Sequence, residues 1–190
     1  MTLSQNRKSF TRKEYHKLAE VGIIKETDRV ELINGDIITM SPINSTHAGM
    51  VNLLNKFLIK KLDDRAIISC QNPIDLSHYF DNSEPEPDIT IARFKADYYS
   101  NAHPTEKDVH VLIEVSDTTL DKDRTTKCTL YAQANIPEYW IINLIDQQIE
   151  IHRKPKNGEY HFKQIISQKE IFNCETIDLE LNYTDLFKIY

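Results

Sequence analysis

The chain has 190 residues, with 23 Lys and Arg against 29 Asp and Glu, which gives a net charge of -6. This length fits one domain over residues 1–190. Hydrophobic residues make up 40% of the chain and only 4 residues are Gly, which excludes collagen-like and low-complexity proteins. The acidic balance argues against strong nonspecific binding of nucleic acid, although it allows a local basic surface around an acidic centre.

The sequence shows no membrane segment. Its apolar runs are a few residues long, whereas a spanning helix needs about 18. Residues 1–12 lack the apolar stretch of a secretory signal, so we expect a cytoplasmic protein. Three widely spaced cysteines, Cys70, Cys128 and Cys174, fit neither a disulfide framework nor a metal knuckle. We therefore predict that they are thiols of the core.

The N-terminal elements are a helix and a hairpin. Thr11 followed by Glu14 forms a capping box and predicts a helix over about 12–21. Two β-rich runs then flank Asn34-Gly35, a pair that readily adopts two positive φ angles. This pattern predicts a β-hairpin over residues 29–40.

The remaining pattern alternates between helix and strand. Apolar residues at helical spacing predict helices over about 46–62 and 121–134. Apolar and β-rich runs predict strands over 66–70, 89–92, 109–115, 138–144, 147–153 and 160–166. No repeat or linker interrupts them. We therefore expect an α/β fold: a mixed central β-sheet flanked by helices, with an N-terminal helix and β-hairpin.

Two carboxylates stand out in this layout. Glu114 lies inside an apolar strand between Ile113 and Val115, and a buried carboxylate is costly unless it is paired, hydrogen-bonded or metal-bound. Asp88 follows Pro87 at the start of another strand, so the two carboxylates converge if these strands are neighbours. Their oxygens would suit Mg²⁺ or Mn²⁺, and nothing in the pattern suits zinc.

Lys127 falls on the helix that follows Glu114, and its side chain can lean back over the end of the strand. A cation there could orient a water nucleophile or stabilise a pentacovalent phosphate. A structural ion pair between Glu114 and Lys127 is the alternative, because such pairs are common.

A family resemblance bears on this choice. The segments Glu84-Pro85-Glu86-Pro87-Asp88-Ile89 and Leu112-Ile113-Glu114-Val115-Ser116 resemble the PD-(D/E)XK nuclease pattern. The rest of residues 10–153 resembles the Uma family of restriction-endonuclease-like proteins, through segments 29–37, 40–42, His47, 121–127 and 131–142. The resemblance rests on the order and spacing of these motifs together.

The resemblance implies a restriction-endonuclease-like core that hydrolyses a phosphodiester bond with Mg²⁺, or with Mn²⁺. Asp88 and Glu114 would be metal ligands, the Val115 carbonyl a backbone ligand, and Glu31 a further acidic member of the site. Ser116 stands where the superfamily pattern has its lysine. The catalytic cation would therefore come from Lys127 on the following helix.

Several residues have two interpretations each. Glu31 fits an exposed strand position as well as the site, and His47 fits a capping or core position as well as a phosphate contact. Asp121 is predicted to cap the helix, and Tyr131 to pack rather than to touch the site, with Gln133 on another face. Four basic residues are candidates for phosphate contacts or simply for solvated surface: Lys56, Lys60, Lys122 and Arg124.

The leading functional hypothesis is a Mg²⁺-dependent endonuclease acting on DNA, in which Asp88 and Glu114 hold the metal and Lys127 assists the attacking water. A catalytically inert module that binds nucleic acid or protein on the same fold is the alternative. A hydrolase of RNA or structured DNA is a third hypothesis. A homodimer would let two sites face two strands.

Overall fold

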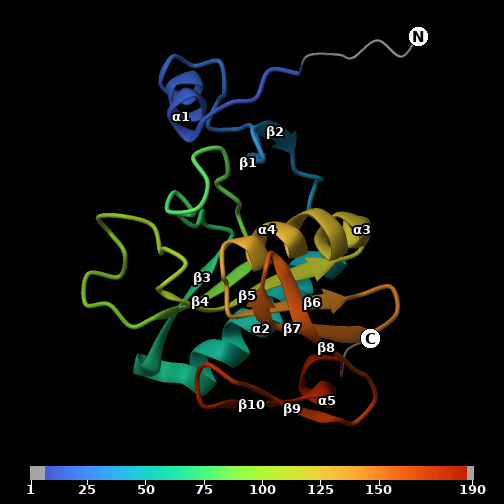
Figure 1. Ribbon diagram of the computed structural model, residues 1–190. Helices are drawn as coiled ribbons and strands as arrows, with labels where there is room; N and C mark the ends of the chain where they lie inside the picture. Colours follow the sequence, from blue (N-terminus) through green and yellow to red (C-terminus); the bar gives the residue numbers. More distant parts are fainter. Residues whose placement is uncertain (1–6, 188–190) are drawn as a thin grey trace.

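The computed structural model describes residues 7–187 and contains a six-stranded sheet at its centre (Figure 1). Its strand order is β3-β4-β5-β6-β7-β8, and all neighbours are antiparallel except the parallel pair β5-β6. The strands are β3 (Ala66–Cys70), β4 (Ile89–Arg93), β5 (Val109–Ser116), β6 (Glu138–Asn143), β7 (Gln148–Lys156) and β8 (Glu159–Ile166). The predicted mixed α/β architecture is confirmed.

Helical segments cover both faces of this sheet (Figure 1). One face carries α3 (Leu120–Lys122), η2 (Asp123–Lys127) and α4 (Cys128–Gln133), which form the crossover between the parallel strands β5 and β6. The other face carries α2 (Ser45–Leu62), followed by the short turn η1 (Asp63–Arg65). A small hairpin of β9 (Ile171–Cys174) and β10 (Leu179–Asn182) joins α2 there, together with α5 (Tyr183–Leu186).

The N-terminal elements stand above the sheet in Figure 1. They are α1 (Arg12–Glu20) and the hairpin of β1 (Val30–Ile33) and β2 (Asp36–Thr39). The predicted capping box at Thr11 and Glu14 is present. Asn34 (φ 50°) and Gly35 (φ 81°) adopt the two positive φ angles of the turn. Both predictions for this region are confirmed.

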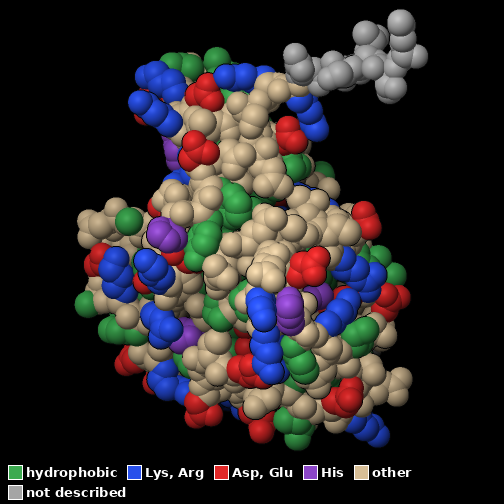
Figure 2. Space-filling model, viewed as in Figure 1, with side chains coloured by type: hydrophobic (Ala, Val, Ile, Leu, Met, Phe, Trp, Pro, Cys, Tyr) green, Lys and Arg blue, Asp and Glu red, His purple; other side chains and the backbone are tan. Residues whose placement is uncertain are grey.

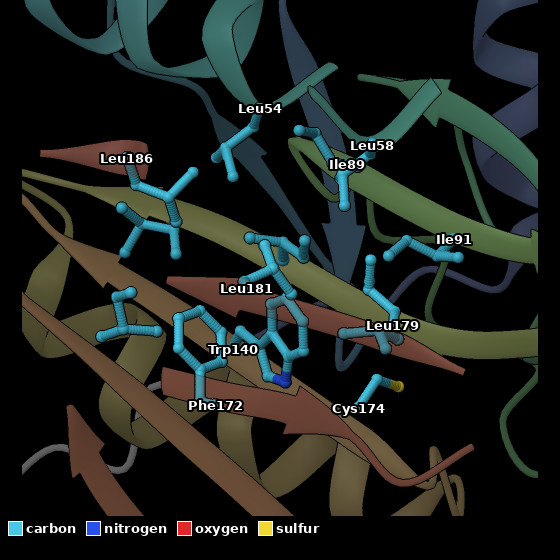
Figure 3. Packing of buried hydrophobic residues seen from close by; sticks show 14 of the residues in the cluster. Leu54, Leu58, Ile89, Ile91, Trp140, Phe172, Cys174, Leu179, Leu181 and Leu186 are labelled. Atoms are coloured by element: carbon cyan, nitrogen blue, oxygen red, sulfur yellow. The ribbon is translucent and has the colours of Figure 1, made fainter. Parts of the chain in front are cut away.

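Apolar side chains fill the space between the sheet and its two coverings. Trp140 of β6 is fully buried against Phe172 of β9, with ring centroids 5.5 Å apart. Figure 3 shows this cluster, to which Leu54 and Leu58 contribute from α2 and Leu179 and Leu181 from β10. A second cluster lies under α4 and includes Tyr131 and Tyr139.

A buried polar cluster attaches the β9-β10 hairpin to the sheet. Glu138, fully buried on β6, accepts hydrogen bonds from Trp140 Nε1 (2.7 Å) and Arg153 Nε (2.9 Å). It also accepts one from the Glu175 backbone N–H in the hairpin turn (3.0 Å). Cys174 is buried beside it, whereas Cys70 and Cys128 are only half-buried. The expectation of core thiols therefore holds fully for one cysteine of the three.

The structure differs from the predicted helix over 121–134 in one respect. The helix begins at Leu120, and residues 123–127 form a π-helical turn rather than regular α-helix. Thr125 Oγ1 donates to the Asp121 carbonyl (2.7 Å), and the Cys128 N–H bonds to the Asp123 carbonyl five residues earlier. A threonine hydroxyl that occupies a helix carbonyl competes with the regular backbone ladder.

The C-terminal hairpin and α5 were not predicted. No helix within residues 7–187 is long and apolar enough to cross a membrane.

Candidate active site

Asp88 and Glu114 meet at one edge of the sheet. Strands β4 and β5 are antiparallel neighbours, and their register pairs Ile89 with Ile113. Asp88, one residue before Ile89, therefore lies across from Glu114, one residue after Ile113. The predicted convergence of the two carboxylates follows from this pairing.

Three hydrogen bonds fix Asp88. Its Oδ2 accepts from the Val115 N–H (2.9 Å) and pairs with His47 Nε2 (3.1 Å), while Gln71 Nε2 donates to Oδ1 (3.3 Å). Burial raises the pKa of Asp88, but the partners His47 and Val115 outweigh it and the pKa lies below its usual value. Asp88 is therefore ionised at neutral pH.

Lys127 and Tyr131 both reach Glu114 from the helix formed by α3, η2 and α4, called the covering helix below. Lys127 Nζ and the Tyr131 hydroxyl each donate to Glu114 Oε1, at 2.9 Å. Burial raises the pKa of Glu114 to about 8, although Lys127 acts in the opposite direction. The pKa of Lys127 is raised, because Glu114 and Glu31 outweigh the effect of burial. Lys127 therefore keeps its proton at neutral pH.

Glu31 of β1 completes the charged cluster. It is 1% exposed, and its oxygens lie 2.6 Å from Lys122 Nζ and 3.3 Å from Lys127 Nζ. Burial raises the pKa of Glu31, but Lys127 and Lys122 together lower it below the usual value. The alternative of an exposed strand residue is wrong, because the hairpin folds this face toward the α3-η2-α4 helix.

Asp123 belongs to the same cluster and was not identified from the sequence as a site residue. Its Oδ2 accepts from Ser116 Oγ (2.7 Å) and Thr119 Oγ1 (2.6 Å). Burial raises its pKa. Asp123 lies four residues before Lys127, a helical spacing that puts the two on one face, and this was the available signal. Ser116 thus donates a hydrogen bond to Asp123 from the end of β5.

The other candidates divide into those near the site and those away from it. His47 bonds to Asp88, and the cap of α2 is Asn44. Tyr131 touches the site as well as packing, so the prediction of packing alone is wrong. Asp121 is exposed in the first turn and does not cap the helix, whose cap residue is Thr119.

Of the four basic candidates, only Lys122 belongs to the charged cluster. Gln133 lies outside this cluster as well. Gln133 is exposed at the end of α4 and lies against Gly158. Arg124 binds Glu150 on β7 instead of facing the site (2.8 Å from Nε). Lys56 and Lys60 are exposed on α2.

A cavity of about 140 Å³ opens onto this cluster. Its lining contains all four acidic residues described above, Glu31, Asp88, Glu114 and Asp123, together with Lys122 and Lys127. These four acidic groups face only two lysines, and a bound divalent cation would favour the ionised form of Glu114, whose pKa in the metal-free protein is about 8.

The donor set suits a hard cation that prefers oxygen ligands. The Val115 N–H points to Asp88, and because the N–H and C=O of a strand residue face the same neighbour, its carbonyl faces that side as well. No hydrogen bond within residues 7–187 occupies Glu114 Oε2. No group of three or more His, Cys, Asp and Glu side chains in this part of the chain is arranged for a metal, so the fit rests on two carboxylates and one carbonyl.

Comparisons with known proteins bear on the family and the fold of the chain. The Uma2 family, described as "Putative restriction endonuclease", matches residues 12–184. A crystal structure from Anabaena variabilis ATCC 29413, described as a "putative nuclease belonging to DUF820", superposes with a TM-score of 0.74 at 17% sequence identity. The match covers 94% of this chain and 98% of that chain, and shows a shared fold. No curated protein matches the chain. Because the family match spans nearly the whole sequence, the chain belongs to the Uma2 family.

Proposed function

We propose that this protein is a metal-dependent endonuclease that hydrolyses phosphodiester bonds of DNA. The observation that carries the proposal is the 2.9 Å contact between Lys127 Nζ and Glu114. It brings a protonated lysine from the covering helix to the carboxylate beside Asp88, although Ser116 occupies the usual lysine position. Carboxylates can hold a metal ion that activates water, and a nearby cation can stabilise the charge that develops on phosphate, so the two together suit phosphodiester hydrolysis.

Asp88, Glu114 and the Val115 carbonyl would hold Mg²⁺ or Mn²⁺. The bound ion would polarise a phosphoryl oxygen and lower the pKa of a water molecule. Asp88 is ready for this role because its hydrogen bonds with His47 and Val115 keep it ionised. Glu114 would present Oε2, since Oε1 already accepts from Lys127 and Tyr131.

Lys127 supplies a fixed positive charge at this centre. It is 4% exposed, and contacts with Glu114 and Glu31 from two sides hold its ammonium group in place. A preorganised cation in a water-poor site stabilises the charge that develops on phosphate more strongly than one in bulk water. Lys127 would thus orient the attacking water and stabilise the pentacovalent phosphate.

The test is cleavage of supercoiled plasmid with Mg²⁺, Mn²⁺ or EDTA. We expect metal-dependent nicking that falls at least about 100-fold in Asp88→Asn and in Lys127→Met. Exposed residues of the same types provide the controls Asp64→Asn and Lys169→Met, which should cut at the rate of the unmodified protein. Circular dichroism would verify that each variant folds.

Two results would contradict the proposal. Cutting that persists in Asp88→Asn would place the chemistry elsewhere or in a contaminant. Tight, metal-independent binding without cutting on plasmid, linear and single-stranded DNA would favour the inert binding module, in which Glu114 and Lys127 form a structural ion pair.

A further inference from the structure

The cavity has two chemically different sides. Its floor consists of the carboxylates and lysines described above, whereas one wall is apolar. This apolar wall is formed by Ile38, Met40, Pro42 and Ile43, from the end of β2 and the segment before α2. Pro42 and Ile43 are exposed, and Ile43 retains 39% of its accessible surface. An exposed apolar surface directly beside a charged centre requires an explanation.

The apolar wall is anchored at both ends. The Met40 N–H donates to the Arg29 carbonyl (2.9 Å), and Arg29 Nη1 donates to the Ser41 carbonyl (3.3 Å). At the other end, Asn44 caps α2 and its Nδ2 donates to Asp117 Oδ2 (2.5 Å), just beyond β5. The wall is therefore a built part of the cavity and ordered against the same strand that carries Glu114.

The faces of unpaired bases fit such a wall. In a duplex the base faces are stacked on each other, so apolar side chains reach only base edges such as the thymine methyl. Unpaired bases expose their faces, and proteins bind them through apolar and aromatic contacts and through Arg planes. Arg29 lines the cavity beside the wall and offers such a plane.

Size and charge also favour an unpaired strand. A cavity of about 140 Å³ admits a phosphate group and an adjoining base, and a base that enters with its phosphate must first leave the stack of a duplex. A duplex carries more phosphate charge per unit length than a single strand, and the protein carries a net charge of -6, so binding through bases suits it better than binding through phosphates. On the face seen in Figure 2, blue and red side chains are interspersed rather than gathered into one basic surface.

We infer that the substrate of this site is an unpaired DNA strand, whose bases lie against Ile38, Met40, Pro42 and Ile43 while its backbone reaches the carboxylate floor. This inference rests on the proposed function and adds its substrate class. Double-stranded DNA would be cut only where a strand is locally open.

Binding can be separated from cleavage in the Lys127→Met protein with Ca²⁺ present, because the cation balances the carboxylates of the floor while cutting is expected to be at least about 100-fold slower. Fluorescence anisotropy would compare a labelled 12-nucleotide single strand, the same strand with abasic residues, and the matching duplex. We expect the single strand to bind at least about 10-fold more tightly than either competitor, since base stacking and apolar contact dominate such binding. Ile43→Ser in this background should weaken binding about 5-fold or more. Ile165→Ser, which changes an isoleucine on β8 that is 49% exposed, should not.

The outcomes distinguish the two proposals. Equal affinity for the abasic strand or the duplex, or no effect of Ile43→Ser, would overturn the inference even if the unmodified protein cuts DNA. Base-dependent binding of the single strand together with no metal-dependent cutting of any DNA would overturn the nuclease proposal and leave a site for unpaired strands. Failure of the single strand to bind would overturn the inference.

Discussion

Replacing Glu114 with glutamine should change how the stability of the metal-free protein depends on pH. Burial raises the pKa of Glu114 from 4.5 to about 8. The folded state therefore binds a proton there that the unfolded state releases above pH 4.5, and folding loses free energy as the pH rises toward 8. Glutamine keeps an oxygen for Lys127 and Tyr131 but cannot ionise.

The magnitude follows from the size of the shift. Each pKa unit corresponds to about 1.4 kcal/mol, so the ionisation of Glu114 costs the folded protein on the order of 5 kcal/mol between pH 4.5 and 8. We expect the unfolding free energy of Glu114→Gln to rise relative to that of the unmodified protein by about 1.4 kcal/mol per pH unit over this range. Lys127 does not titrate there, because its pKa is raised.

Urea denaturation with EDTA at pH 5.5, 6.5 and 7.5 would measure this difference. Glu180→Gln removes the same charge from an exposed position on β10 and controls for net charge. Titrating groups distant from Glu114 are common to both proteins and cancel in the comparison. Parallel stability curves for Glu114→Gln and the unmodified protein would refute the reasoning, because they would mean that Glu114 is ionised throughout.

Four further outcomes are expected. Tyr131→Phe should lower the unfolding free energy at pH 9, where Glu114 is ionised, by about 1.5–3 kcal/mol in urea titrations, because a hydrogen bond to a charged group is lost. Glu138→Ala should cost about 3–5 kcal/mol and lower the Tm, since it leaves Arg153 buried without its main partner. Burial lowers the pKa of His152 from 6.5 to about 4, so stability should fall as the pH drops from 6.5 to 4, and His152→Phe should flatten this fall. Gly35→Ala should cost about 1–3 kcal/mol in thermal denaturation, because φ is 81° and a Cβ would overlap Ser9.

The central sheet was predictable because its strands carry strong local signals. Strands that are buried on both faces appear in a sequence as continuous apolar runs. Strands β5 and β6 are buried at every position. The Asn34-Gly35 pair dictates its own turn. In contrast, β9 and β10 have four residues each, and no Asn-Gly pair joins them. Their pairing depends on tertiary contacts such as those of Trp140 with Phe172 and of Glu138 with the turn.

The candidate site was partly predictable for a related reason. A glutamate within an apolar strand demands a partner, which pointed to Glu114 and Lys127. The sequence does not show whether Glu31 faces the site or the solvent. Strand β1 has only four residues, too few for the alternation of apolar and polar residues to show which face is covered. Tyr131 depends on where the covering helix starts and on the π-helical turn within it, neither of which has a reliable local signal, whereas the spacing of Asp123 and Lys127 was a usable signal for Asp123.

The π-helical turn at 123–127 has a consequence for how this chain could change over generations. It holds one residue more than an α-helical turn would, and each residue advances a helix by about 100°. Deletion of Thr126 would restore regular pitch without touching β5 and would put the lysine three residues after Asp123, a spacing that keeps both side chains on one face of an α-helix. A lysine carried by the helix therefore tolerates the loss of one codon and stays on the face of Asp123, whereas the same loss within a β-strand would turn every later side chain of that strand to the other face of the sheet.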